Sequence, residues 1–199
     1  MLKLIEPYIL TFIPLFVAVD AIGNIPVFVS MVEALSKRQR QRIIIESTTT
    51  AAILAVLFMF IGKWVFGVIG ITISDFQVAG GILLFVISVK LLLPGSSKLV
   101  LSNGHDKDVG VFPLGTPLIT GPAVLTTVLI MRDSFGVWPT FISLVVNMLI
   151  AWVTLIKADV IMKLMGAGGT RAFSKIMYIL LAAIGVMLVR RGIFALFIK

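Results

Sequence analysis

Long apolar stretches follow one another along almost the whole chain, and this pattern limits its fold more than any other feature. Six stretches reach the length of about 20 residues that a helix needs to cross the hydrocarbon of a bilayer. They cover residues 7–32, 43–66, 73–93, 111–131, 135–158 and 172–197. No charged residue lies within 111–131 or 134–156. We therefore expect an all-α integral membrane protein with six transmembrane helices.

The composition agrees with burial in lipid rather than in a soluble core. Hydrophobic residues make up 59% of the 199 residues and charged residues only 13%, too few to cover a soluble domain of this length. The longest polar stretch, 94–110, is a connecting loop, so residues 1–199 are expected to form a single domain within the bilayer. The formal net charge of +8 does not indicate nucleic acid, because the basic residues are scattered between the apolar spans.

The basic residues also predict the orientation of the chain, because cytoplasmic loops carry an excess of lysine and arginine. With six spans, eleven of the 17 basic residues fall on one side, including the run at 37–42, and six fall on the other. The smaller group consists of Lys3, Lys63, Arg132, Arg190, Arg191 and Lys199. We therefore place the larger group in the cytoplasm and both termini outside, although the basic residues near the C-terminus favour the reverse.

The two halves of the chain show a weak internal correspondence. At a shift of 98 residues, two glycines and one threonine meet the same residue types: Gly23 with Gly121, Gly70 with Gly168, and Thr72 with Thr170. Each half has three spans, an odd number, so the second half must enter the membrane from the opposite side. We therefore expect two inverted three-helix repeats, 1–95 and 111–199, joined by a cytoplasmic loop at 96–110.

The first and fourth spans are each interrupted by glycine and proline, near residues 23–26 and 120–122. Proline removes a backbone donor, and glycine adds conformational freedom. In lipid the freed backbone groups must be satisfied by protein or by a water-filled cavity, so both breaks should face the interior of the bundle. We expect helices 1 and 4 to be broken and to restart there, with Asn24 as the N-cap of one half-helix and Pro122 as the first residue of the other.

The paired breaks predict a binding site between them, because a restarted helix presents unpaired amides that suit a carboxylate or another anion. The predicted substrate-binding residues are Asp20, Gly23, Asn24, Thr120, Gly121, Pro122 and Ala123. Asp20 is the only ionisable residue well inside a span, and such residues are costly in lipid and often functional. We assign ion coupling to Asp20 and Asn24; the alternative role for Asp20 is a structural cap of the adjacent break.

The remaining polar residues indicate neither catalysis nor metal binding. The chain has no cysteine, and its one histidine, His105, lies in the central loop without enough neighbouring ligands for a metal. We therefore expect no catalytic residue, no metal and no cofactor. Gly80 and Gly81 permit close approach of helices, and we interpret them, together with Asn147 in the fifth span, as packing residues.

Two sequence motifs coincide with the two breaks. The first is Asp20-x-x-Gly23-Asn24-x-Pro26-x-Phe28, and the second is Pro113-Leu114-x-x-Pro117-x-x-x-Gly121-Pro122. Together they resemble the MarC family of inner-membrane proteins, and the resemblance covers essentially the whole chain. In that family a proline usually follows the aspartate, whereas this chain has Ala21, which we expect to soften the kink.

The resemblance implies a multi-pass protein of the cell (inner) membrane, similar to the LysE-type amino acid transporters. It implies a secondary transporter of a small solute, such as a neutral amino acid like glycine or alanine, coupled to H+ or Na+. The absence of an ATP-binding motif agrees with ion coupling. The alternatives are an exporter of other metabolites or drugs, or a non-transporting membrane scaffold. An enzyme is disfavoured because the spans carry no constellation of catalytic residues, and the oligomeric state stays open.

Overall fold

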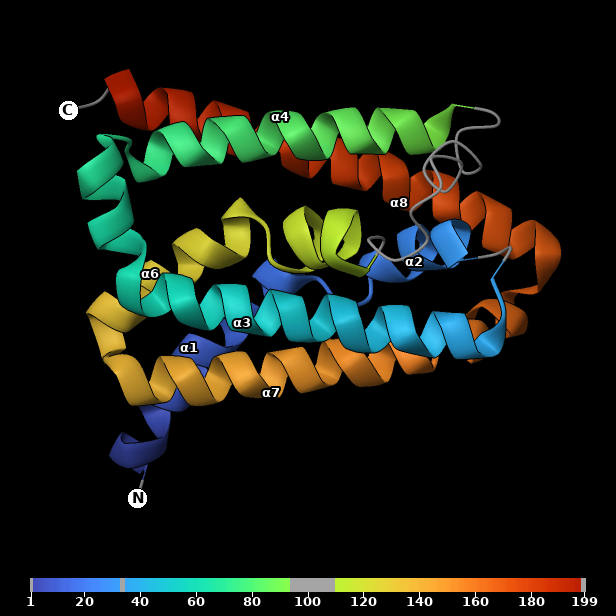
Figure 1. The fold of residues 1–199 in the computed structure, drawn as a ribbon, viewed down its shortest axis with the longest axis horizontal. Coiled ribbons are helices and arrows are strands. Elements are labelled where there is room, and N and C mark those ends of the chain that lie inside the picture. Colours follow the sequence, from blue (N-terminus) through green and yellow to red (C-terminus); the bar gives the residue numbers. More distant parts are fainter. Residues whose placement is uncertain (1, 33–34, 94–109, 198–199) are drawn as a thin grey trace.

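The computed structural model describes residues 2–32, 35–93 and 110–197, and every regular element in these residues is a helix (Figure 1). The elements are α1 (Leu2–Val19), α2 (Asn24–Val32), α3 (Lys37–Ile69), α4 (Ile73–Leu92), the π-helical η1 (Gly110–Ile119), α6 (Pro122–Phe135), α7 (Val137–Ile156) and α8 (Ala158–Phe197). The expected all-α class is confirmed for these residues. His105 and most of the expected loop at 96–110 lie outside the described residues.

Five segments of these helices are long and apolar enough to cross a membrane. They are Ile5–Val29, Lys37–Ile69, Ile73–Leu92, Val137–Ile156 and Ala172–Leu196. The remaining expected span, 111–131, is divided between η1, of 10 residues, and α6, of 14 residues. Neither helix reaches the length of about 20 residues that a crossing requires. This segment can therefore cross the hydrocarbon only as a pair of half-helices.

Local capping explains where α3 ends and α4 begins. Helix α3 ends at Gly70, whose φ of 79° is a left-handed conformation that glycine adopts without strain. Helix α4 begins after Thr72, whose hydroxyl accepts a hydrogen bond from the N–H of Asp75 at 3.1 Å. The Asp75 carboxylate in turn accepts from the N–H of Thr72 at 2.7 Å, which completes a capping box. The two helices are therefore joined by residues 70–72 alone.

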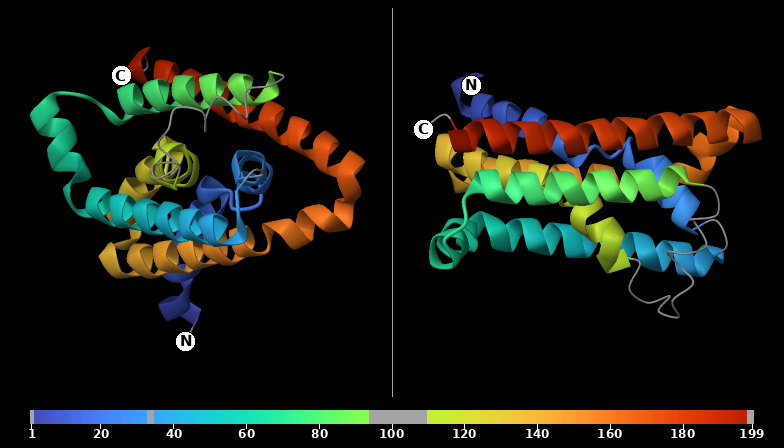
Figure 2. Two further views of the ribbon diagram at one scale, coloured as in Figure 1. Left: turned by 45° about the vertical axis from the view of Figure 1, so that its right-hand side comes forward. Right: turned by 90° about the horizontal axis from the view of Figure 1, so that it is seen from above.

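Long helices flank the short helices α2 and η1 (Figures 1 and 2). Helices α4 and α8 lie side by side along one flank and α3 and α7 along the other, while α2 and η1 lie between them. Both termini lie at the same end of the bundle as the α3–α4 and α6–α7 connections. Residues Ile25, Val27 and Met31 of α2 are accordingly buried. The core is thus built around the interrupted helices.

Glycines allow the closest contacts between helices. Gly81 of α4 and Gly185 of α8 approach so closely that a Cβ atom on either would lie 2.5–2.6 Å from the carbonyl oxygen of the other. Gly80 lies against the ring of Pro122, which a Cβ atom at position 80 would overlap. Small residues commonly permit such contacts between membrane helices. The interpretation of Gly80 and Gly81 as packing residues is therefore confirmed.

Buried hydrogen bonds hold α1 against α7. The hydroxyl oxygens of Thr11 and Ser143 lie 2.7 Å apart, and Asn147 Nδ2 donates to the Phe12 carbonyl oxygen at 3.3 Å. Thr11, Ser143 and Asn147 are almost completely buried. Hydrogen bonds of this kind commonly connect neighbouring membrane helices, and the expected packing role of Asn147 is confirmed.

Candidate functional site

The first break lies between α1 and α2, where the chain turns at Asp20. This residue has a φ of 44°, in the left-handed region that aspartate tolerates better than most residues. Its Oδ1 accepts a hydrogen bond from the N–H of Gly23 at 3.1 Å. In the opposite direction, Asn24 Nδ2 donates to the Val19 carbonyl oxygen at 3.0 Å. The two side chains thus satisfy backbone groups on both sides of the break.

This arrangement differs from the expected N-cap at Asn24. Asn24 is the first residue of α2, and its side chain turns back to the end of α1 instead of capping α2. The first two amides of α2 are already paired, because the N–H of Asn24 donates to the Asp20 carbonyl oxygen and that of Ile25 to the Ile22 carbonyl oxygen. The N–H of Gly23, just before α2, donates to the Asp20 side chain. Asp20 is therefore the capping residue, and these amides are not free for an anion. The motif that this chain resembles usually has a proline at the position of Ala21. The helix is interrupted here even without that proline.

The second break lies between η1 and α6, where the sequence predicted it. Gly121 is extended, with φ −95° and ψ −175°, and precedes Pro122, the first residue of α6. A Cβ atom at position 121 would collide with the Pro117 carbonyl oxygen, so only glycine fits there. The hydroxyl of Thr120 donates to the Ala51 carbonyl oxygen in α3 at 3.0 Å, and this side chain is fully buried. The break is thus fixed by one close backbone contact and one hydrogen bond to a neighbouring helix.

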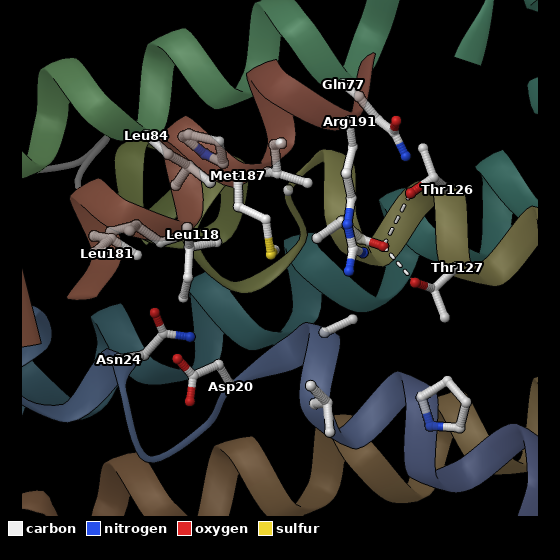
Figure 3. A pocket seen from close by; sticks show the side chains of 18 of the residues that line it. Asp20, Asn24, Gln77, Leu84, Leu118, Thr126, Thr127, Leu181, Met187 and Arg191 are labelled. Atoms are coloured by element: carbon white, nitrogen blue, oxygen red, sulfur yellow. Dashed lines mark hydrogen bonds between the residues drawn. The ribbon is translucent and has the colours of Figure 1, made fainter. Parts of the chain in front are cut away.

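A cavity of about 480 Å³ borders both breaks (Figure 3). Residues of α1, α2, α4, η1, α6 and α8 form its walls. The polar side chains that line it are Asp20, Asn24, Gln77, Thr126, Thr127 and Arg191. Apolar side chains, among them Leu118, Leu181 and Met187, form much of the remaining wall. The breaks therefore create a mixed polar and apolar pocket inside the helical bundle.

Four of the seven predicted binding residues line this cavity. They are Asp20, Asn24, Gly121 and Ala123. The other three belong to the breaks but not to the cavity lining: Gly23, Thr120 and Pro122. Thr120 instead bonds to α3, and Pro122 packs against Gly80 of α4. Both half-helices therefore present a residue near their N-terminus to the cavity, Asn24 of α2 and Ala123 of α6.

Sequence reasoning does not single out the remaining polar lining residues. The hydroxyls of Thr126 and Thr127 donate to carbonyl oxygens one turn earlier in α6, both at 2.7 Å, so they resemble ordinary helix residues. Gln77 lies close to the start of α4 and Arg191 close to the end of α8, where polar residues usually mark the ends of a span. Charge within the stretch 172–197 is the one signal that points to Arg191, but Lys175 and Arg190 share it.

The cavity carries one acidic and one basic side chain. Asp20 and Arg191 both line it but form no ion pair with each other. No group of three or more metal-ligating side chains occurs in the part of the chain that the structure describes. The carboxylate can interact with a cation or an ammonium group, and the guanidinium can donate to an anion. The lining therefore offers one group for a cation and one group for an anion.

The fold and the cavity define an integral membrane protein with discontinuous helices. Within this class, the chain belongs to the MarC family, because the family model described as "MarC family integral membrane protein" matches residues 5–197. The match covers both breaks and every helix that lines the cavity. The resemblance carried by the two motifs is thereby confirmed.

Similar chains occur in archaea and bacteria. UPF0056 membrane protein MJ0972 of Methanocaldococcus jannaschii is 34% identical, over 96% of this chain and 88% of the relative. A UPF0056 membrane protein of Archaeoglobus fulgidus is 31% identical, over 92% and 90%. The UPF0056 inner membrane protein YhgN of Escherichia coli strain K12 is 25% identical, over 90% and 92%. None of these three names states a substrate or an enzymatic activity. No solved structure matches the chain significantly.

Proposed function

We propose that the chain is a secondary transporter of a small solute, which binds in the cavity at the two helix breaks. The observation that carries this proposal is the half-buried Asp20 carboxylate in the wall of a cavity of about 480 Å³. This volume lies within the range of about 300–1,000 Å³ that small-molecule sites occupy. Broken helices around a site in the bundle interior are a recurring feature of secondary transporters.

The substrate class is a small neutral amino acid such as glycine or alanine. Asp20 suits the ammonium group of such a solute, and the apolar wall formed by residues such as Leu118 and Leu181 suits a short uncharged side chain. The coupling ion is H+ or Na+, with Asp20 and Asn24 as the residues that sense it. Asp20 Oδ1 is held by the backbone of Gly23, which leaves the second carboxylate oxygen for the solute or the ion. When Asp20 takes up a proton or binds Na+, its negative charge is neutralised. This change links the movement of the ion to the movement of the solute.

In this transporter the chain crosses the membrane six times as two inverted three-helix repeats. The N- and C-termini lie at one end of the bundle, as an even number of crossings requires (Figure 1). The first crossing of each half is interrupted, at 20–23 and at 120–121. These interruptions border a single cavity, which supports a site shared by the two repeats.

Uptake by the purified chain in proteoliposomes tests the proposed function. We expect radiolabelled glycine or alanine to accumulate when a proton or sodium gradient is imposed, and not when the gradient is dissipated. Empty liposomes and the Asp20→Asn variant serve as controls. Correctly folded protein that moves no amino acid under either gradient would contradict the proposal and favour export of another metabolite or a non-transporting scaffold.

The orientation follows from the basic residues near the start of α3 and is tested by cysteine labelling. Because the chain has no native cysteine, Gln39→Cys and Ser134→Cys each introduce a unique thiol at an exposed position. These positions lie at opposite ends of the bundle. In intact cells we expect a membrane-impermeant maleimide to label position 134 and to spare position 39 until the membrane is permeabilised. The reverse pattern would place both termini in the cytoplasm.

A further inference from the structure

Arg191 is a basic side chain in the wall of a cavity that otherwise contains one acid, Asp20. It lies near the end of α8, and it forms no ion pair in the part of the chain that the structure describes. A guanidinium has five N–H donors and no acceptor, so it recognises carboxylates and other planar anions by paired hydrogen bonds. The cavity thus holds an anion-binding group as well as a carboxylate.

The surroundings of Arg191 offer little to neutralise it. Figure 3 shows Gln77 of α4 beside Arg191, on the side of the cavity that also holds Thr126 and Thr127. The two threonine hydroxyls already donate to backbone carbonyl oxygens of α6. Gln77 brings an amide with two N–H donors, and among the described residues Asp20 is the one acid that lines the cavity. This side of the cavity is therefore rich in donors for an anion.

The acidic group lies in a different part of the same cavity. Figure 3 shows Asp20 and Asn24 together, apart from Gln77 and Arg191. Asp20 is fixed by the N–H of Gly23 and Asn24 by the Val19 carbonyl oxygen, so neither is free to swing toward Arg191 without breaking a capping bond. The fold therefore keeps a negative and a positive group separate within one small pocket.

From this separation we propose that Arg191, assisted by Gln77, recognises the carboxylate of the transported solute, while Asp20 faces its ammonium group. The inference rests on the proposed transport function and deepens it, because it makes the substrate class a zwitterion. Arg191 then acts as a specificity-determining residue that admits solutes with a negative group. An amine without a carboxylate gains nothing from the guanidinium and is repelled by its charge.

The neighbouring Arg190 provides a matched control for charge and position. Both side chains are exposed and both lie in the same turn of α8, but only Arg191 lines the cavity. The experiment measures competition against radiolabelled alanine by unlabelled alanine and by alaninamide, in which an amide replaces the carboxylate. It is carried out in proteoliposomes with the wild-type chain and with the variants R191Q, R191K and R190Q.

In the wild type we expect alaninamide to compete at least about tenfold more weakly than alanine, as the loss of a charge-assisted hydrogen bond predicts. In R191Q we expect alanine to bind more weakly. The preference for alanine over alaninamide should largely disappear. R191K keeps the charge but loses the paired donors, so it should retain part of the preference. R190Q should keep the wild-type preference.

The outcomes separate this inference from the transport function itself. If the wild type takes up alanine and R191Q shows the same preference as R190Q, then Arg191 only extends to lipid headgroups and the inference is overturned, while transport stands. If no amino acid is bound or transported by the wild type, both fail together. If R191Q does not fold, competition in the wild type still tests whether the carboxylate is recognised. Equal competition by alanine and alaninamide would rule that recognition out.

Discussion

Asp20→Asn is expected to keep the fold and to abolish accumulation of the solute against its gradient. A carboxylate inside a membrane span costs several kcal/mol unless it is paired, solvated or protonated. The structure gives Asp20 a backbone hydrogen bond and a position in the cavity wall, but no basic partner within the described residues. In the proposed transporter an ion or the solute balances this charge when water in the cavity does not. An amide at this position cannot change its charge, so the proposed link between ion and solute would be lost.

The substitution is conservative for the break itself. The asparagine oxygen can still accept from the N–H of Gly23, and asparagine tolerates the left-handed φ of 44°. Asp20→Ala, in contrast, removes the cap and should lower the free energy of unfolding by about 1 kcal/mol. A comparison of the two variants by thermal unfolding in detergent separates the structural role of this residue from its role in coupling.

The decisive measurement is gradient-driven uptake at matched incorporation of protein. We expect Asp20→Asn to retain at most exchange down the solute gradient, with no response to imposed proton or sodium gradients. Glu46→Gln, which removes a carboxylate of α3 outside the cavity, should behave like the wild type. Unchanged ion dependence in Asp20→Asn would leave this residue as a structural cap only. The coupling site would then have to include Asn24 or the backbone carbonyl oxygens at the breaks.

Gly80→Ala is expected to destabilise the fold more than Asp20→Ala does, with a loss of about 1–3 kcal/mol in the free energy of unfolding. The added methyl group would overlap the ring of Pro122, and a proline ring cannot rotate away as a flexible side chain can. Helix α4 or the start of α6 must therefore move. Because Gln77 and Ala123 on these two helices line the cavity, we expect uptake to fall together with the melting temperature.

Gly67→Ala is the matched control for this substitution. Gly67 lies within α3, and a Cβ atom added there would meet no other atom within 4 Å. Alanine is favoured over glycine in a helix by about 0.5–1 kcal/mol, so this variant should melt at the wild-type temperature or slightly above it. A Gly80→Ala variant that is as stable and as active as Gly67→Ala would show that the contact between α4 and α6 is not tight.

Much of the fold could be predicted from the sequence because lipid imposes local rules. A crossing helix has a required length, and this requirement places the third span at 73–93, where the structure has Ile73–Leu92. The second break was equally predictable, because Pro122 removes a backbone donor wherever it lies. The first break was predicted near residues 23–26 but lies at 20–23, and Pro26 is accommodated in the first turn of α2. These features depend on a few consecutive residues and on the solvent around them.

The details of the site depend on helices that are distant in sequence. Asn24 has the residue type of an N-cap, yet it turns back to Val19 because Asp20 already occupies the amides of the turn. Thr120 stands beside the predicted site, yet its hydroxyl bonds to Ala51, 69 residues away along the chain. The partner of Thr120 could not be predicted from local sequence, because it depends on which helix lies next to the break. The partner of Asn24, in contrast, lies only five residues away along the chain.

The sequence by itself therefore determined a helical membrane protein with two broken spans and one acid, Asp20, inside them. Only the tertiary structure decided that Arg191 of α8 and Gln77 of α4 line the same cavity as that acid. The physical reason is that an apolar span carries no pattern that distinguishes a lipid-facing flank from a protein-facing one, since both are apolar. Glycines 81 and 185 bring α4 and α8 together, and that contact gives the cavity its positive side.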